Sequence, residues 1–474
     1  MAQGASVATA IEPQQEKCWP PGIFEDTLEC GGLRQTTKET GACLPSQTER
    51  LIRLQSTLSK DARLPGLVNA HSHAFQRVIR GRTEYRTSND KDSFWTWREM
   101  MYSAAARLSP EDIYDASRMA FLEMALSGIT AVGEFHYLHH AADGTPYDDS
   151  NLLAKQVVRA ANDVGLRIAL LRVAYARAGF EAGPNPRQAR FIEGDADQYL
   201  KNLTQLRKDL GAENAMAWIG VAPHSVRAVP LAYLKQIVAF ANNERLPVHM
   251  HVAEQAAEVS ACINEYGRSP VALLSTEDLL SERFTAVHAI HVTPKAVRML
   301  AEARASVCAC PTTERNLGDG IVPIDGYFKA GVRVSLGSDS QVQIDLLEDA
   351  RELEYHLRLQ KMERAVLAQG VDVKSALAAR LFECATVNGS QSINAPVATQ
   401  ENDEPADFFT VDLNDPSLAG ANEDNLLAQV VFSLSRTAVK DVVVGGKRIV
   451  EDGHHPQQEE IVEGFKALQK KLWG

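Results

Sequence analysis

Short apolar segments alternate with longer amphipathic segments through the middle of the chain. The amphipathic segments repeat apolar residues at helical spacing, and we predict helices at 109–128, 151–165, 195–211, 230–244, 256–276, 294–303, 324–330, 346–367 and 374–388. The apolar segments have the composition of strands that are buried on both faces, and we place them at 64–70, 129–135, 166–173, 217–223, 247–254, 285–290, 306–311 and 333–339. Eight strands that alternate with helices predict an α/β protein with a (β/α)8 TIM-type barrel. A doubly wound parallel sheet is the alternative, but it does not need eight repeats.

The two ends of the chain follow a different pattern. Residues 406–413 are predicted as a strand, 440–453 as a hairpin around a Gly-Gly turn, and 459–473 as an amphipathic helix. A short helix is predicted near 47–60, and the sequence before it has weak periodicity. We therefore predict a small β-rich domain built from the N- and C-terminal segments. The predicted limits are 1–60 for the leader and part of this small domain, 61–390 for the barrel, and 391–474 for the rest of the small domain with the terminal helix.

Size and charge narrow the class of protein. A chain of 474 residues, 45% of them hydrophobic, fits a large barrel with a smaller domain. The net charge of −12 and the lack of a Lys/Arg cluster argue against nucleic-acid binding. No apolar run approaches the roughly 20 residues of a membrane span. The N-terminus lacks a basic region followed by a long apolar core, so we expect a cytoplasmic protein without a signal peptide.

The cysteines do not form a recognisable framework. There are seven of them, irregularly spaced and without a CxxC pair, so we expect free thiols in a reducing compartment rather than disulfides or a Cys-rich zinc site. Cys308 and Cys310 lie in an apolar run and are expected to be buried on a strand.

Polar residues gather where the predicted strands end. In a (β/α)8 barrel the catalytic groups come from the C-terminal ends of the strands, so side chains at these positions converge on one mouth of the barrel. The residues at or just past strand ends are His71, His73, His224, His249, His251, Glu254, His288, His291 and Asp339. This concentration indicates an active site.

His71 and His73 are two residues apart on an extended segment, so both side chains point to the same face. With His251 and Asp339 they would supply three imidazoles and one carboxylate. This set suits Zn²⁺, which binds N and O ligands at about 2.0–2.2 Å and keeps a position open for water in catalytic sites. We therefore expect one Zn²⁺ per chain, with Fe²⁺ as the alternative for the same ligands.

Proton transfer needs groups beside that metal. Glu254 comes three residues after His251, and its carboxylate is placed to act as base and then as proton shuttle. Asp339 is expected to bind the metal through one oxygen and orient the water through the other, and His288 to polarise or position the water. His249 also faces inward, either as a core histidine or as a site residue.

Seven segments resemble the amidohydrolase superfamily. They are HSHAFQR, DSFWTWREMMY, GEFHYLHH, GVAPHSVRAV, HMHVAEQ, CPTTERNLGDG and GSDS, and the likeness runs from about residue 64 to residue 453. HSHAFQR, DSFWTWRE and PTTExNLGDG are similar to a narrower group, the deiminases that act on formimidoylglutamate. The lack of a Lys at the end of the fourth strand favours a single-metal site.

The resemblance implies a reaction and a set of residues. A metal-activated water would attack the formimidoyl carbon of N-formimidoyl-L-glutamate, releasing ammonia and N-formyl-L-glutamate in histidine degradation. The resemblance implies that His71, His73, His251 and Asp339 hold the metal, and that Glu254 and His288 handle protons. It implies a substrate pocket of Gln76, Arg98, Tyr137, His224 and Arg227. We also expect that the protein is a homodimer and that its substrate is a small molecule.

The substrate's charge gives an independent argument. Formimidoylglutamate is dianionic, and carboxylates are bound well by guanidinium groups. Arg98, in an aromatic segment over 94–98 expected to be a loop, and Arg227, after the fourth strand, are suitably placed. The aromatic segment would be a lid over the site or simply packing. The alternatives are a deaminase of a cyclic amidine such as guanine or a related purine, which would need stacking and amide contacts, and an inactive barrel scaffold.

Overall fold

The computed structural model describes residues 60–474 except 87–91, 181, 184, 212–213, 369–373 and 397–405. The predictions made for residues 1–59, including most of the helix near 47–60, lie outside the described residues.

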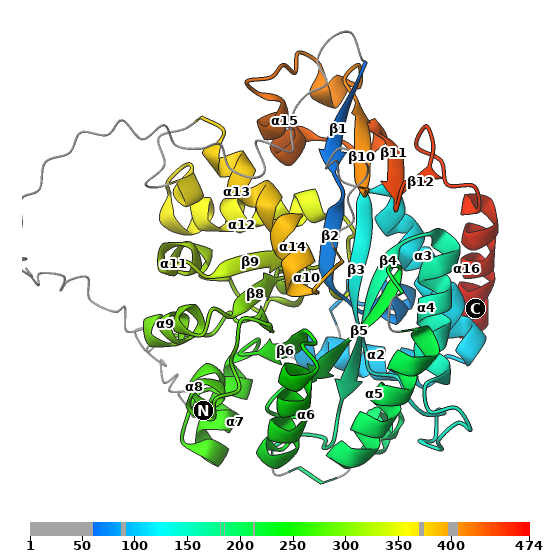
Figure 1. The fold of residues 1–474 in the computed structure, drawn as a ribbon, viewed down its shortest axis with the longest axis vertical. Coiled ribbons are helices and arrows are strands. Elements are labelled where there is room, and N and C mark those ends of the chain that lie inside the picture. Colours follow the sequence, from blue (N-terminus) through cyan, green and yellow to red (C-terminus); the bar gives the residue numbers. More distant parts are fainter. Residues whose placement is uncertain are drawn as a thin grey trace, which may run out of the picture. The chain divides into compact units, whose positions relative to one another are not determined.

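Eight parallel strands form the central sheet, and each strand pairs with the next one along the chain (Figure 1). The strands are β2 (Leu67–Ser72), β3 (Ile129–His136), β4 (Arg167–Ala174), β5 (Ala217–Pro223), β6 (Val248–Val252), β7 (Phe284–His288), β8 (Ser306–Ala309) and β9 (Arg333–Leu336). The sheet nearly closes on itself, because the His73 N–H donates to the Asp339 carbonyl and the Asp339 N–H donates to the His71 carbonyl, each at 3.0 Å. The predicted TIM-type barrel is therefore confirmed.

Helices separate the strands and surround the sheet (Figure 1). They are α2 (Phe94–Ala105), α3 (Pro110–Leu126), α4 (Leu152–Val164), α5 (Ala196–Leu210), α6 (Leu231–Asn243), α7 (Ala256–Tyr266), α8 (Pro270–Thr276), α9 (Pro294–Glu302), α10 (Pro311–Leu317), α11 (Ile324–Ala330), α12 (Leu346–Lys361), α13 (Ala376–Cys384), α14 (Val387–Ser392), α15 (Leu426–Ser433) and α16 (Gln458–Trp473). Among the described residues, no helix is both long enough and apolar enough to span a bilayer.

Three predicted helices differ in extent from the observed ones. The segment 256–276 is two helices, because Gly267 adopts a left-handed conformation with φ 69° that ends α7. The long helix from 346 stops at Lys361, where Met362 has φ 55°. The segment 374–388 contains α13 and the start of α14 rather than one helix.

The segment 94–98, expected to be a loop, is the first turn of α2. The Ser93 side chain accepts a hydrogen bond from the backbone at the start of this helix, and the Thr96 hydroxyl accepts one from the Ser93 N–H at 3.0 Å. This reciprocal pair caps the helix in the manner of a capping box. The loop assignment was therefore wrong, and Arg98 is held on a regular helix.

A second, antiparallel sheet lies apart from the barrel. Its order is β1-β10-β11-β12, from β1 (Asp61–Pro65), β10 (Phe408–Asp412), β11 (Val439–Val444) and β12 (Lys447–Val450). The segment predicted as one strand over 64–70 passes from this sheet into the barrel at Gly66, whose N–H donates to the Asp407 carbonyl at 3.1 Å. A Cβ on Gly66 would lie 2.2 Å from the Thr130 hydroxyl oxygen, so only glycine fits this crossing.

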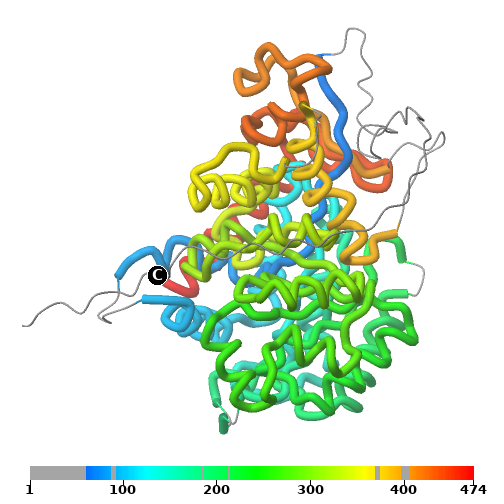
Figure 2. The backbone as a smooth tube through the Cα atoms, turned by 90° about the vertical axis from the view of Figure 1, so that its left-hand side faces the viewer, coloured from blue at the N-terminus to red at the C-terminus, as the bar shows by residue number. Residues whose placement is uncertain are grey.

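The C-terminal helix packs back onto the barrel layer. In Figure 2 its end lies beside the segment that contains α2, and the Arg107 guanidinium donates to the Leu472 carbonyl at 2.9 Å. The Trp473 indole N–H donates to the Val78 carbonyl at 3.2 Å. The C-terminal helix thus contacts the residues that follow β2 and the residues that follow α2.

Candidate metal and catalytic site

The four predicted metal ligands meet at one point. His71 and His73 come from the end of β2, His251 from β6, and Asp339 from the residues after β9, and their ligand atoms all lie within 4.8 Å of one another. The Asp339 Oδ1 atom is 3.2 Å from His73 Nε2 and 3.5 Å from His71 Nε2. All four side chains are buried.

The ring orientations fit a metal ion. His73 Nδ1 bonds to the Phe135 carbonyl at 2.8 Å and His251 Nδ1 bonds to the His224 carbonyl at 3.0 Å, so each Nε2 is left for the centre. Such bonds are the usual way in which a protein fixes the tautomer of a ligating histidine. Within the described part of the chain, both ring nitrogens of buried His71 lack a hydrogen-bond partner. Unpaired buried nitrogens are costly, and a metal ion would satisfy one of them.

The protonation states also fit a metal ion. Burial lowers the pKa of His71 to about 3 and holds the pKa of His251 well below its usual value. Burial alone would raise the pKa of Asp339, but the His71, His73 and His288 side chains that face it hold it well below its usual value. Neutral imidazoles and an ionised carboxylate are the forms that bind metals.

Left-handed backbone conformations cluster at these strand ends. Ala253, His288, Asp339 and Gln341 have φ values of 51°, 67°, 47° and 62°. Such conformations cost on the order of 1 kcal/mol or more for residues other than glycine and persist where the surroundings enforce them. Here they turn the chain sharply at the barrel mouth, where the candidate side chains gather.

A buried polar network supports the ligands from beneath. The Ser72 hydroxyl, between the two histidines of β2, donates to Glu134 at 2.5 Å and accepts from Gln341 Nε2 at 2.8 Å. Ser338 accepts from Asn69 at 2.7 Å and donates to Gln341 at 3.0 Å. The network therefore links β2 to the residues on both sides of Asp339, where only an isolated β-bridge joins the two strands.

Glu254 and His288 lie next to the ligand cluster. His288 Nε2 is 3.8 Å from Glu254 Oε1 and 3.8 Å from Asp339 Oδ2, while His288 Nδ1 is 3.2 Å from Glu314 Oε1. Burial by itself would lower the pKa of His288, but the Glu254 and Glu314 carboxylates raise it well above its usual value. Burial raises the pKa of Glu254 to about 8. Glu314 was not predicted as a site residue. In the structure it is buried, and its carboxylate pairs with His288.

The five predicted substrate-pocket residues line one cavity together with Glu254, His288 and three of the four cluster residues, His73, His251 and Asp339. These five are Gln76, Arg98, Tyr137, His224 and Arg227. Gln76 Nε2 donates to the Tyr137 hydroxyl at 2.8 Å. Phe94 and Trp97 of the aromatic segment also line the cavity, and its wall contains five side chains that were not predicted: Met101, Tyr102, Tyr175, Phe191 and Leu317.

The two arginines of the cavity have unused hydrogen-bond donors. In the described part of the chain, Arg98 Nε and Nη1 and Arg227 Nη1 are buried without a partner. Burial lowers the pKa of Arg98. A buried guanidinium with unpaired N–H groups is unfavourable unless a ligand supplies acceptor atoms. The cavity is therefore suited to an anionic ligand.

Two other inward or strand-end histidines do not join the ligand cluster. His249 Nε2 bonds to the Ser392 carbonyl of α14 at 2.9 Å, and the ring is fully buried. His291 Nε2 bonds to the Asp319 carbonyl at 2.9 Å. His249 thus bonds through Nε2 to α14 and lies outside the ligand cluster.

A parallel eight-stranded barrel with buried histidines and an aspartate at its C-terminal strand ends defines a metal-dependent hydrolase. Residues 63–449 match the amidohydrolase family, and the chain belongs to this family. It is 40% identical over 410 residues to formimidoylglutamate deiminase of Pseudomonas aeruginosa, an alignment that covers 86% of this chain and 89% of that protein. It is 28% identical to 5-methylthioadenosine/S-adenosylhomocysteine deaminase of Haloquadratum walsbyi, over 82% of this chain and 79% of that protein.

A solved structure supports the same fold. The crystal structure of an amidohydrolase from Brucella melitensis superimposes with a TM-score of 0.80 at 36% identity, and covers 87% of this chain and 90% of that chain. An adenosine deaminase from Xanthomonas campestris with bound zinc, at 23% identity, has a TM-score of 0.72 over 87% of this chain and 86% of that chain and shares the fold.

Proposed function

We propose that this chain is a formimidoylglutamate deiminase, which hydrolyses N-formimidoyl-L-glutamate to N-formyl-L-glutamate and ammonia in histidine degradation. The observation that carries the proposal is that one cavity is lined by three residues of the ligand cluster and by two arginines with unpaired donors. The ligand cluster would hold the metal for hydrolysis, and the two arginines would bind a substrate with two carboxylates. The 40% identity to the Pseudomonas aeruginosa enzyme supports it.

The metal is proposed to be one Zn²⁺ per chain, held by His71, His73, His251 and Asp339, with Fe²⁺ as the alternative. When bound there, such an ion supplies Lewis acidity and lowers the pKa of water. The cluster's three imidazoles and one carboxylate are the ligand types that zinc takes.

The chain's own side chains would then move the protons. Glu254 accepts a proton from the attacking water and returns it to the nitrogen that leaves as ammonia. A group that does both needs both protonation states within reach of neutral pH, and a pKa of about 8 meets this requirement. His288, fixed by Glu314, faces Glu254 and Asp339 and holds the water between them.

The rest of the cavity would orient the substrate. Arg98 and Arg227 bind the carboxylates of the glutamate part. Gln76, Tyr137 and His224 line the same cavity as His73, His251 and Asp339. We propose that they contact the formimidoyl group. The wall excludes water with aromatic and apolar side chains, which strengthens every charged interaction inside.

Deamination of a purine nucleoside is the second candidate, favoured by the aromatic wall and by the Haloquadratum walsbyi relative. A flat, uncharged base would leave the unpaired N–H groups of the arginines unsatisfied. An ammonia-release screen of formimidoylglutamate, guanine, cytosine and adenosine separates the two. We expect turnover of formimidoylglutamate alone, and turnover of a nucleobase or nucleoside in its place would overturn the proposal.

Replacing either arginine with methionine should weaken substrate use. An Arg–carboxylate hydrogen bond contributes about 1.5–3 kcal/mol, so we expect Arg98→Met or Arg227→Met to lower kcat/KM by roughly 10- to 1000-fold. Metal content should not change. The loss should shrink on an analogue that lacks the matching carboxylate. If each variant lost the same factor on the full substrate and on every truncated analogue, the arginines would have a structural role.

Three further assignments belong to the proposal. We propose a homodimer and a cytoplasmic location, and light scattering after gel filtration tests the first. The division into 1–60, 61–390 and 391–474 also stays a prediction.

A further inference from the structure

Two tyrosines of the cavity wall, Tyr102 and Tyr175, are bonded to one buried glutamine, Gln188. Gln188 Nε2 donates to the Tyr102 hydroxyl at 2.6 Å and to the Tyr175 hydroxyl at 2.8 Å. Gln188 lies on the 3-10 helix η2 (Pro186–Phe191), Tyr102 on α2, and Tyr175 just after β4. At most 3% of each residue is exposed, so these two hydrogen bonds form away from solvent. In the described part of the chain, Gln188 Oε1 has no partner, and the amide is held through Nε2 alone.

The direction of these bonds leaves the tyrosine protons free. Each phenol oxygen accepts from Gln188, and in the described part of the chain neither hydroxyl donates to a protein acceptor. Burial raises the pKa of Tyr102 to about 12, so its hydroxyl keeps its proton at neutral pH. Two oriented O–H donors therefore await an acceptor.

Both hydroxyls belong to the wall that carries the arginines. Tyr102 and Tyr175 line the cavity together with Arg98 and Arg227. Arg98 and Tyr102 are one turn apart on α2, and the Arg98 guanidinium carbon lies 5.4 Å from the Tyr102 ring centroid. Two guanidinium groups and two phenols thus form a cluster in which every member is a hydrogen-bond donor.

We propose that Gln188 is a positioning residue for a carboxylate subsite, in which Tyr102 and Tyr175 donate to one carboxylate of the substrate alongside the arginines. The inference rests on the proposed function and deepens it. The amide fixes both phenol oxygens, so their protons point to the ligand rather than to each other. A site with several preset donors recognises an anion better than a site that must order them on binding.

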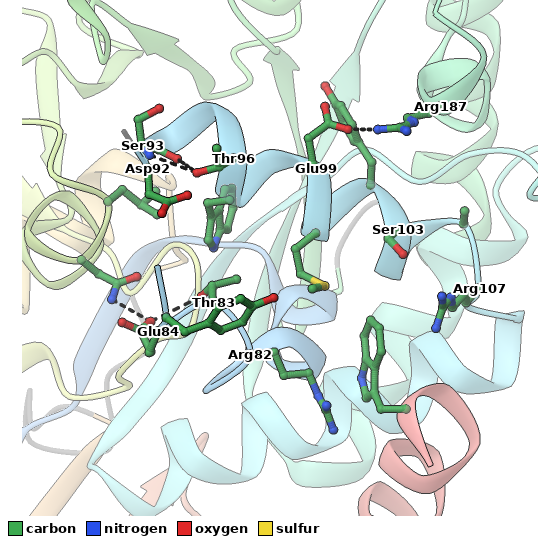
Figure 3. A pocket seen from close by; sticks show the side chains of 18 residues that line it. Arg82, Thr83, Glu84, Asp92, Ser93, Thr96, Glu99, Ser103, Arg107 and Arg187 are labelled. Atoms are coloured by element: carbon green, nitrogen blue, oxygen red, sulfur yellow. Dashed lines mark hydrogen bonds and ion pairs between the residues drawn. The ribbon is translucent and has the colours of Figure 1, made fainter. Parts of the chain in front are cut away.

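Two other residues of η2 also contact α2. Arg187 forms an ion pair with Glu99, which Figure 3 shows on the side of a larger hollow of about 760 Å³. Arg190 donates to the Ala105 carbonyl at the end of the same helix. Arg187 and Glu99 are both more than half exposed, and such surface pairs contribute little. We therefore expect the buried Gln188 amide, rather than this ion pair, to orient the Tyr102 and Tyr175 hydroxyl groups.

The test compares Gln188→Met, Gln188→Glu, Tyr102→Phe and Tyr175→Phe in steady-state kinetics of ammonia release from formimidoylglutamate. Gln188→Met keeps the volume but not the amide, and we expect KM to rise about 5- to 50-fold while kcat changes by less than about threefold. Gln188→Glu should raise KM further, because a carboxylate there attracts both phenol protons and repels the substrate. Each Phe variant should raise KM in the same way, and Gln188→Met should add little in the double Phe background.

The matched control is Arg187→Met, the neighbouring residue of η2, which should leave both constants unchanged. Two analogues locate the subsite: N-formimidoyl-4-aminobutyrate lacks the α-carboxylate, and N-formimidoyl-2-aminobutyrate lacks the γ-carboxylate. The Gln188→Met effect should shrink on at least one of them. An effect on both analogues as large as on formimidoylglutamate, or a fall in kcat with KM unchanged, would overturn the inference. Failure of the wild-type protein to release ammonia from formimidoylglutamate would instead overturn the proposed function.

Discussion

Replacing His73 with alanine is expected to yield protein that retains its fold but holds no metal and releases no ammonia. His73 Nε2 faces Asp339 at 3.2 Å, and its Nδ1 is engaged by the Phe135 carbonyl, so the ring is committed to the cluster. Removal of one of four ligands leaves a site that a transition metal does not hold well. Metal content measured by mass spectrometry, beside circular dichroism and ammonia release, checks each part of this expectation.

A matched control exists in the same chain. His249 is also buried and faces inward, but its Nε2 bonds to the Ser392 carbonyl, so His249→Gln should keep the metal. Metal that binds the folded state alone also stabilises it. Added zinc should therefore raise the Tm of metal-free wild type and of His249→Gln, but not of His73→Ala. Full metal occupancy in His73→Ala would show that this cluster is not the metal site.

The barrel could be predicted because its signals are local. Buried strands are short and apolar, and helices repeat at their own period, so the alternation is visible in the sequence. The grouping of His71, His73, His251 and Asp339 followed from one further rule, that strand ends share the mouth of the barrel. None of these inferences required knowledge of which side chains touch.

Where the expectation failed, packing decided the outcome. The aromatic segment before Arg98 reads as a loop because its apolar residues are not confined to one face, yet the Ser93 and Thr96 cap starts a helix there. The strand predicted over 64–70 divides at Gly66, since the close approach of Thr130 is set by another strand. Both features depend on neighbours that the local pattern does not reveal.

The supporting residues were out of reach for a similar reason. Gln341 meets Ser72 across 269 positions of sequence, and Gln188 meets Tyr102 across 86. Glutamine carries no periodic or motif signal, so its role emerges only when distant strands and helices are brought together. Histidine and aspartate at strand ends can be recognised from the sequence, because polar residues are uncommon in apolar segments and indicate a functional role there.

Glu254→Gln is expected to lower kcat by at least about 10²-fold while the metal and the substrate still bind, because the amide cannot take up or return a proton. Glutamine has the shape of glutamate, so the cavity should keep its form. His288 loses one of its carboxylate neighbours, but Asp339 and Glu314 remain beside it. Single-turnover ammonia release measures the chemical step. Metal analysis tests whether the metal still binds, and KM tests whether the substrate still binds.

The control for this change is Glu265→Gln on α7, where the carboxylate pairs with Arg177 instead of facing the cluster. It should leave kcat unchanged, which separates loss of proton transfer from loss of a partly buried negative charge. If Glu254→Gln turned over at a near-normal rate, the proton role would pass to Asp339 or His288, because His288 Nε2 lies 3.8 Å from both Glu254 Oε1 and Asp339 Oδ2. If it instead lost metal, Glu254 would belong to the structure of the site rather than to its chemistry.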